Sequence, residues 1–207
     1  MSRPPSGTLS EIVVTHENAD ADGVASMVAL SMLRPGLRIM IPHGFDPQSR
    51  ALWEDNAASL PPLLTEADLA TVLKTAGSTR LLVADTSRAA RLGPLAPHVG
   101  EFAEVLAFDT HPPAPNELPR SPLPQAGSCA AALACELHAR GIVPDPVRAG
   151  VILVGIHVDT GHFTFPGTTA VDHQGAAHCL AWGADAAFVT RYAARGFSTR
   201  QLRLMDA

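Results

Sequence analysis

The sequence contains few cysteines, and their spacing fits neither a zinc ribbon nor a disulfide framework. Only three occur among the 207 residues, Cys129, Cys135 and Cys179, and no two of them form a C-x-x-C pair. Small secreted domains that depend on disulfides carry dense, paired cysteines, and structural zinc sites need clustered thiolates. We therefore expect an ordinary hydrophobic core in which the three thiols have packing roles.

Long apolar segments and an excess of positive charge are also missing. The first ten residues, MSRPPSGTLS, have no apolar run like that of a secretory signal, and the longest apolar stretch, around 151–158, contains His157. That stretch is too short to span a bilayer. Fifteen basic against twenty acidic residues give a net charge of −5, which excludes the basic footprint of a protein that coats duplex DNA. We expect a cytoplasmic protein without a membrane partner.

The composition is that of a folded globular domain. Hydrophobic residues make up 46% of the chain and charged residues 17%, which excludes a disordered tail. We expect a flexible lead-in over 1–10 and one domain over 11–190. Residues 191–207 are interpreted as the start of a linker helix truncated from a longer chain, because Ser198 and Gln201 form a capping box that opens a last helix.

Short β-branched runs alternate with segments of helical spacing along the chain. The pattern predicts strands at 11–15, 37–41, 81–84 and 104–108, and helices at 22–33, 65–75, 128–140, 146–158, 172–182 and 185–195. Residues 42–64 are expected to be irregular, and 112–124 form a proline-rich loop. This alternation predicts an α/β fold with a mainly parallel sheet flanked by helices.

Three of the predicted strands are each followed by an ionisable residue, namely His16, Asp85 and Asp109. Ligands of open α/β sheets bind outside the carboxyl ends of the strands. A single acid at such a position is more often a turn residue, but three strands that deliver acids or histidine to one edge indicate a functional site.

The loop after the first strand carries one imidazole and two carboxylates within seven residues, His16, Asp20 and Asp22. Nitrogen combined with carboxylate oxygen suits Mg²⁺ or Mn²⁺. The alternative is that Asp20 or Asp22 only caps the following helix, which explains one acid but not the set. Asp159 ends a second apolar helix, where the helix dipole disfavours a carboxylate unless a cation or water offsets it.

Together, four motifs resemble those of the DHH phosphoesterase family in order and spacing. They are His16-x3-Asp20-x-Asp22, Asp85-Thr86-Ser87, Asp109-Thr110-His111-Pro112 and Gly155-Ile156-His157-Val158-Asp159-Thr160-Gly161. The segments 163–169 and 183–185 look most like the branch in which a DHH region precedes CBS repeats and a tRNA nucleotidyltransferase or poly(A) polymerase. The nanoRNase/RecJ-like proteins are the next nearest branch.

The resemblance implies a site with two metal ions, usually Mn²⁺, with Mg²⁺ as the alternative. His16 and Asp20 would hold the first ion, Asp22 and Asp159 the second, and Asp85 both. The implied reaction is hydrolysis of a phosphodiester in a short oligonucleotide or a related small nucleotide by metal-activated water.

The same resemblance implies roles outside the metal ligands. Asp85, Asp109 and His111 would be catalytic, and His111 would contact the substrate phosphate. Gly127 and Ser128, at the start of a helix, would present backbone N–H groups to the substrate.

The sequence departs from the family pattern at Thr110, where the family has a metal-binding histidine. A hydroxyl is a weaker ligand than imidazole, and His157 and His162 are candidates to compensate. The alternative function is therefore an impaired domain that binds nucleotides or RNA beside a nucleotidyltransferase, with tRNA contacts through a following domain. A third, weaker interpretation is an inorganic pyrophosphatase. The sequence does not predict an oligomeric state.

Overall fold

The computed structural model describes residues 10–41 and 43–193, and its centre is a parallel sheet of five strands. The strands are β1 (Ser10–Val14), β2 (Arg38–Met40), β3 (Leu63–Leu64), β4 (Thr79–Ala84) and β5 (Glu104–Phe108). Their order is β3-β2-β1-β4-β5, and every pair is parallel. The α/β prediction is confirmed. The expected lead-in, except Ser10, and the helix expected after Ser198 lie outside the described residues.

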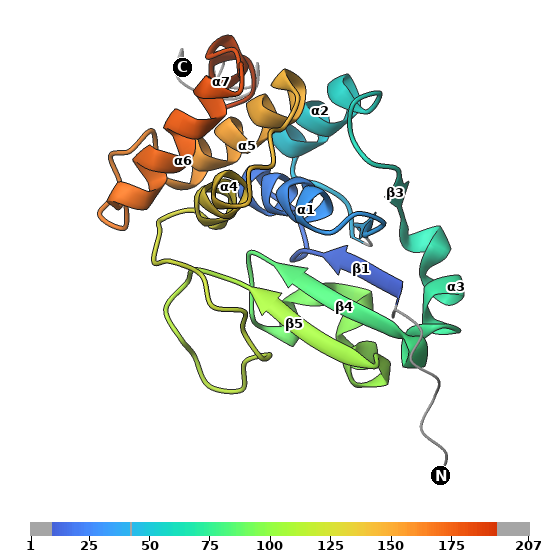
Figure 1. The fold of residues 1–207 in the computed structure, drawn as a ribbon. Coiled ribbons are helices and arrows are strands. Elements are labelled where there is room, and N and C mark those ends of the chain that lie inside the picture. Colours follow the sequence, from blue (N-terminus) through green and yellow to red (C-terminus); the bar gives the residue numbers. More distant parts are fainter. Residues whose placement is uncertain (1–9, 42, 194–207) are drawn as a thin grey trace, which may run out of the picture.

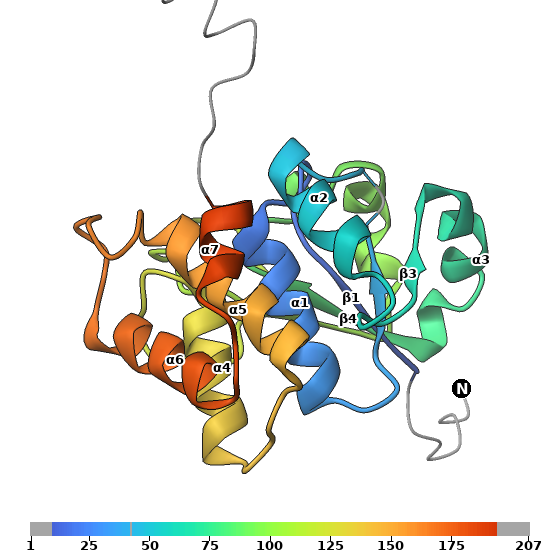
Figure 2. The same cartoon turned by 90° about the horizontal axis from the view of Figure 1, so that it is seen from above.

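All the described α-helices except α3 cover one face of the sheet (Figures 1 and 2). They are α1 (Ala21–Leu33), α2 (Pro47–Asn56), α4 (Cys129–Ala139), α5 (Pro146–Asp159), α6 (Ala170–Ala181) and α7 (Ala187–Tyr192). The opposite face carries α3 (Leu69–Leu73) and the 3₁₀ segments at Ala76–Ser78 and Ala89–Glu101. No helix in the described part of the chain has the length and apolar character needed to cross a bilayer.

The central strands are buried on both faces, and alternate side chains enter different cores. In β1, Ile12 and Val14 pack with the 3₁₀ layer, whereas Val13 packs with the helical layer. This is the two-residue period of a strand. Because both faces are covered, β1 reads as a continuous apolar run, which is typical of parallel sheets.

The segment 42–64, expected to be irregular, contains α2 and the short edge strand β3, so that prediction was wrong. Asp46 caps α2 by accepting a hydrogen bond from Ser49 N at 2.7 Å, and Pro47 occupies the first turn. Both are helix-start signals. The helix buries Leu52 and Trp53 but is otherwise polar, so the apolar period was too weak to show it.

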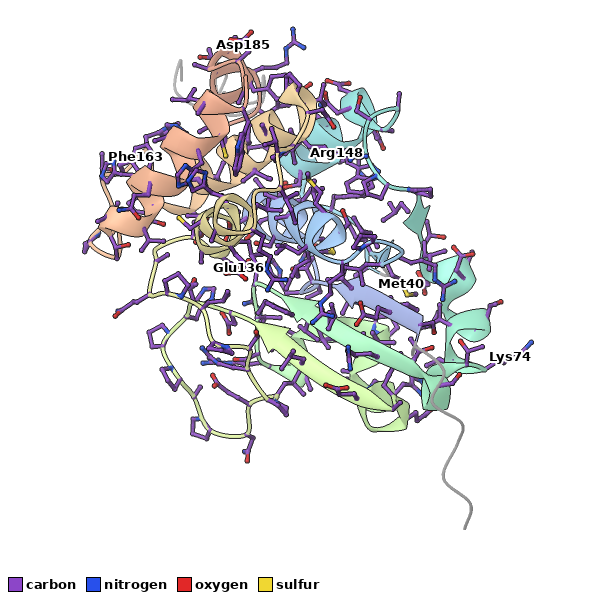
Figure 3. The ribbon with its side chains drawn as sticks, viewed as in Figure 1. Met40, Lys74, Glu136, Arg148, Phe163 and Asp185 are labelled. Carbon is purple, nitrogen blue, oxygen red and sulfur yellow. The ribbon has the colours of Figure 1, made fainter. Side chains whose placement is uncertain are left out.

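The proline-rich loop lies beside β5 and covers its edge. Ala107 N donates to Pro119 O and Ser121 N donates to Ala107 O, both at 2.7 Å, and Leu118 N donates to Ser87 O at 2.8 Å. In Figure 1 the loop stands at the left, where the strands point. Figure 3 places Lys74, the only lysine, at the opposite end of the molecule. In the described part of the chain, the basic side chains near the loop are therefore those of arginine and histidine.

Candidate metal centre and active site

The site forms where the direction of the strand order reverses. β1 lies between β2 and β4, and the chain leaves the carboxyl ends of β1 and β4 next to each other. Crevices for ligands form at such switch points. His16 follows β1 and Asp85 follows β4, and His16 Nε2 lies 3.4 Å from Asp85 Oδ2. The topology thus joins two residues that are far apart in the sequence.

Asp20 adds a second carboxylate to His16. Asp20 caps α1 by accepting from Gly23 N at 2.9 Å, and its Oδ2 lies 3.4 Å from His16 Nε2. His16 Nδ1 donates to Glu17 O at 2.9 Å. That bond orients the ring so that Nε2 faces both carboxylates, as metal-ligating histidines are oriented. Burial disfavours a charged ring, but the two carboxylates raise the pKa of His16 to about 10.

Asp85 is held in a sparsely populated backbone conformation and has an unpaired buried oxygen. Its φ is 60°, and its side chain is almost fully buried. Its Oδ1 has no hydrogen-bond partner among the described residues. Burial first, and then the charge of Asp22, raise the pKa of this carboxyl well above its usual range. A buried oxygen without a donor is costly unless a cation or proton meets it.

Two groups of metal-type ligands share Asp85. Within the described residues, His16, Asp20 and Asp85 have ligand atoms within 4.8 Å of one another, and so do Asp85, Asp109 and His111. Carboxylate oxygens with imidazole nitrogen suit Mn²⁺ and Mg²⁺. Together with the unpaired Asp85 oxygen, this donor set fits divalent metal binding.

Asp109 and His111 form a charged pair at the edge of this cluster. His111 Nδ1 lies 2.7 Å from Asp109 Oδ1, which also accepts from His111 N at 3.0 Å. Asp109 raises the pKa of His111 to about 9. Burial opposes ionisation of Asp109, yet the bonds from His111 and Ser87 lower its pKa to about 2. The His111 ring is half exposed and thus offers a positive charge to an incoming anion.

Sequence reasoning missed Arg120, which ties the proline-rich loop to the site. Its guanidinium donates to His111 O at 2.7 Å and to Ser87 Oγ at 2.8 Å, and it lies 3.2 Å from Asp109 Oδ2. Glu117, on the same loop, is a further partner at 2.5 Å. No local motif marks Arg120, because its partners come together only in the folded chain.

Asp22 is placed in the interior, against the start of α4. Its carboxylate accepts hydrogen bonds from Ser128 Oγ at 2.6 Å, Cys129 N at 2.8 Å and Ala130 N at 3.0 Å. A carboxylate has about four acceptor positions, so one remains on Oδ2. Burial raises the pKa of Asp22 to about 6. Asp22 thus caps α4 from another helix, and its role as a metal ligand stays a prediction.

The N–H groups of Gly127 and Ser128, expected to face the substrate, are bound to Asp172. Each donates to a different Asp172 oxygen at 2.9 Å, and Asp172 is fully buried. Gly127 nevertheless lines the large cavity beside the site. A substrate contact by these two N–H groups would require Asp172 to release them, and that role stays a prediction.

Asp159 ends α5 as expected, and its electrostatic surroundings place it near the cluster. Burial and then Asp22 and Asp20 raise its pKa to about 8, whereas His111 acts in the opposite direction. Asp159 and Asp22 belong to neither ligand group among the described residues. The structure therefore groups Asp85 with Asp109 and His111, where a second set of Asp22, Asp85 and Asp159 was expected.

The candidates for compensating the missing histidine face each other. His157 Nδ1 lies 3.2 Å from His162 Nδ1, and neither ring belongs to the two described ligand groups. His162 and Phe163 have positive φ angles of 57° and 67°. The turn after α5 therefore has an uncommon backbone conformation, which is often found in functional segments. Thr110 instead lines the large cavity.

Two cavities open beside His111. The larger, of about 680 Å³, is lined by the residues after β5, the proline-rich loop, the segment that leads into α4 and Gly167, and the smaller is about 250 Å³. Four prolines line the larger one, Pro112, Pro113, Pro122 and Pro124. Asp109, His111 and Pro112 line both cavities. The charged pair therefore belongs to the walls of both cavities.

Comparison with known proteins finds relatives in both sequence and fold. No family model matches the chain. An A-adding tRNA nucleotidyltransferase of Geobacter sulfurreducens is 29% identical over 203 residues, which are 95% of this chain. The chain spans 22% of that protein's length.

Two solved structures share the fold. An exopolyphosphatase-related protein from Bacteroides fragilis superposes with a TM-score of 0.75 and 18% identity, over 95% of this chain and 59% of that protein. A Methanococcus jannaschii protein assigned to the family II inorganic pyrophosphatases gives 0.62 and 20%, over 83% and 55%. Both likenesses show a shared fold, and the fold of these two structures agrees with the resemblance that the motifs indicated. The nucleotidyltransferase relative agrees with the branch that the sequence favoured.

Proposed function

We propose that this chain is a divalent-metal-dependent phosphodiesterase, with Mn²⁺ as its ion, that hydrolyses short oligonucleotides or a related small nucleotide. One observation carries the proposal. At the carboxyl ends of β1, β4 and β5, Asp85 joins the His16–Asp20 ligands to the Asp109–His111 pair, beside a cavity large enough for an organic group. The fold shared with phosphohydrolase-like proteins supports the phosphoesterase part of the proposal.

The residues divide the chemistry between them. A bound divalent ion supplies charge stabilisation at the phosphoryl oxygens and makes a water acidic. His16, Asp20 and Asp85 hold that ion at the switch point of the sheet. His111, kept protonated by Asp109, donates from its free ring nitrogen to a phosphoryl oxygen or to the departing oxygen. Arg120 holds Asp109 and the His111 backbone in place.

The larger cavity favours a nucleoside over a second inorganic phosphate. Four prolines, Leu123 and Ala126 form the apolar part of its wall. The one arginine or lysine that lines it, Arg120, already has Asp109 and Glu117 as partners. With His111 assigned to the scissile phosphate, a second inorganic phosphate would need further free donors and positive charge, whereas the apolar part of the wall suits a sugar and base. This supports a nucleotide substrate, and contacts to tRNA through a following domain belong to the same proposal.

The test combines metal titration with hydrolysis of a dinucleotide. We expect calorimetry to show Mn²⁺ binding to the natural protein and at least about tenfold weaker binding to Asp85→Asn, which removes the shared ligand charge. Hydrolysis of UpU is expected to fall by about 100-fold or more. Asp145→Asn is the control, because Asp145 caps α5 and pairs with Arg148 at the exposed start of that helix, at the opposite end from Asp159. Undiminished hydrolysis by Asp85→Asn would refute the proposal.

One observation favours a second candidate, the impaired domain that binds nucleotides or RNA. Thr110 stands where an imidazole was expected, and Asp22 and Asp159 remain outside the described ligand groups. Thr110→His separates the two candidates. A large gain in Mn²⁺ stoichiometry and hydrolysis would mean that the natural domain is impaired. An active natural protein that gains nothing from the histidine supports the enzyme.

A further inference from the structure

The turn that follows α5 brings two imidazole rings together outside the ligand groups at the strand ends. His157 lies in the last turn of α5 and His162 in the turn after it, and their Nδ1 atoms are 3.2 Å apart. The ring centroids are 5.3 Å apart, and the ring planes are inclined by 53°. The two nitrogens are much closer to each other than the ring centres are, so they face one another across a short gap.

The distance between the two nitrogens matches that of two ligands on one transition-metal ion. Imidazole nitrogen binds Zn²⁺ at about 2.0–2.1 Å. Two such nitrogens are then about 3.3–3.4 Å apart in tetrahedral coordination, and about 2.9 Å apart at a right angle. The observed 3.2 Å lies between these values. Both rings can therefore bind the same ion with little movement.

The backbone of the turn and a neighbouring aromatic ring hold the two histidines in this arrangement. His162 N donates to His157 O at 2.8 Å, and Gly161 N donates to Val158 O at 3.2 Å. With Gly161 at a φ of 54°, these two bonds form a Schellman motif. The Phe163 ring, labelled in Figure 3, meets the His157 ring edge-on at 4.7 Å between centroids. Ligands that are already in place lose less conformational freedom when an ion binds.

The donor chemistry of this pair differs from that of the ligand groups that share Asp85. Within the described residues, neither His157 nor His162 belongs to a group of three or more ligand side chains. Paired imidazoles suit Zn²⁺, Ni²⁺ and Cu²⁺, whereas carboxylates suit Mg²⁺ and Mn²⁺. His162 is exposed, so water can complete the coordination of an ion. The carboxyl end of a helix also favours a cation.

We propose that His157 and His162 form a separate site for one nitrogen-preferring divalent ion, with Zn²⁺ as its representative and water in the remaining coordination positions. The ion links the last turn of α5 to the turn that ends the helix. It thereby stiffens the segment that contains Asp159. The site does not depend on the proposed function, because none of its ligands takes part in that chemistry.

A second pair of histidines supplies a matched control. His138 on α4 and His178 on α6 stack with their ring centroids 3.8 Å apart and their planes 12° from parallel. The lone pair of an imidazole nitrogen lies in the plane of its ring, so the lone pairs of two stacked rings do not meet at one ion. Removing this pair deletes the same two side chains without deleting a convergent site.

The test measures Zn²⁺ binding by calorimetry in an untagged Asp85→Asn protein, which lacks the charge of the carboxylate shared by the other two ligand groups. The titration is made at about pH 7.5, above the ordinary imidazole pKa of about 6.5. We expect this protein to bind Zn²⁺. Adding His157→Gln/His162→Gln is expected to weaken the binding at least about tenfold, whereas adding His138→Gln/His178→Gln is expected to leave it unchanged.

A second measurement needs no variant. In the natural protein, NMR of the imidazole nitrogens is expected to show the His157 and His162 signals shifting together as Zn²⁺ is added, while those of His138 and His178 stay in place.

The outcomes separate this inference from the proposed function. Absence of Zn²⁺ binding to the Asp85→Asn protein would overturn the site and leave one imidazole donating a hydrogen bond to the other. Equal effects of the two double substitutions would overturn it as well, and so would unshifted His157 and His162 signals. A natural protein that hydrolyses no dinucleotide refutes the proposed function alone, since Zn²⁺ binding is measured without substrate.

Discussion

At the scale of single residues, Asp22 and Asp85 show how similar carboxylates acquire different roles. Both are buried, and burial raises the pKa of each. Asp22 receives three hydrogen bonds from the start of α4. Asp85 keeps an oxygen without any hydrogen-bond partner in the described structure. Asp22 therefore contributes to stability without a metal, whereas Asp85 keeps one oxygen available to a cation.

Asp22→Ala is expected to destabilise the metal-free protein by about 2–3 kcal/mol, because it leaves buried donors of α4 without an acceptor. Asp22→Asn keeps one acceptor oxygen, so its loss is expected to be smaller. The measurement is the free energy of unfolding in urea. Asp145→Ala is the control, since it removes an exposed helix cap worth about 1 kcal/mol. A loss in Asp22→Ala no larger than in the control would contradict the structural role.

At the scale of elements, the separation of α1 and α5 sets the spacing of the acids. α1 follows Asp20 and carries Asp22, and α5 ends in Asp159. The two helices approach closely at Gly155, where an added Cβ would lie 2.6 Å from Ala25 Cβ and 2.9 Å from Ala21 O. Because interiors are close-packed, a larger residue at this point must move one helix.

Gly155→Ala is therefore expected to cost about 1–3 kcal/mol of stability, although alanine favours a helix by about 1 kcal/mol over glycine. It is also expected to weaken Mn²⁺ binding by moving α1 relative to the sheet. Urea unfolding and calorimetry measure the two effects. Gly77→Ala serves as the control, because nothing lies within 4 Å of a Cβ built there. A stabilised Gly155→Ala protein would show that the helices can separate freely.

At the scale of the whole molecule, the folded metal-free chain binds protons more tightly at its site than the unfolded chain does. The pKa of His16 is raised to about 10 by Asp20 and Asp85 against the effect of burial. Asp109 raises that of His111 to about 9. Burial followed by Asp22 raises that of Asp159 to about 8. A raised pKa in the folded state contributes stability below the unfolded pKa, and this stability is lost as the pH rises through the folded value.

We therefore expect the metal-free protein to lose stability between pH 7 and pH 9. One pKa unit corresponds to about 1.4 kcal/mol, so the buried His16 and the largely buried Asp159 together are expected to cost at least about 1 kcal/mol, or about 3 °C in Tm. Thermal unfolding followed by circular dichroism at the two pH values measures this. Saturating Mn²⁺ is expected to raise Tm more at pH 9, because the ion replaces the protons. A Tm that rises with pH without metal would contradict this balance of charges.

Much of the fold and part of the site could be predicted from local patterns. The strands that precede His16, Asp85 and Asp109 were found by their apolar runs, and the rule for parallel strand ends placed these residues at one edge. The predicted proximity of His16 and Asp85 is confirmed at 3.4 Å. The helix α2 was not predicted, because a short helix whose buried apolar side chains are only Leu52 and Trp53 shows little hydrophobic periodicity.

The sequence by itself determined the alternation of strands and helices, the order of the motifs and the types of ligand, because these follow from side-chain chemistry and from periods of two and 3.6 residues. Tertiary structure alone decided which groups stay unpaired. In the folded chain, Asp172 accepts from the N–H groups of Gly127 and Ser128, and Asp22 accepts from the start of α4. Arg120 donates to the His111 carbonyl. These outcomes depend on contacts between distant segments. A carboxylate's neighbours, rather than its position in a motif, determine whether its oxygens remain free for a metal.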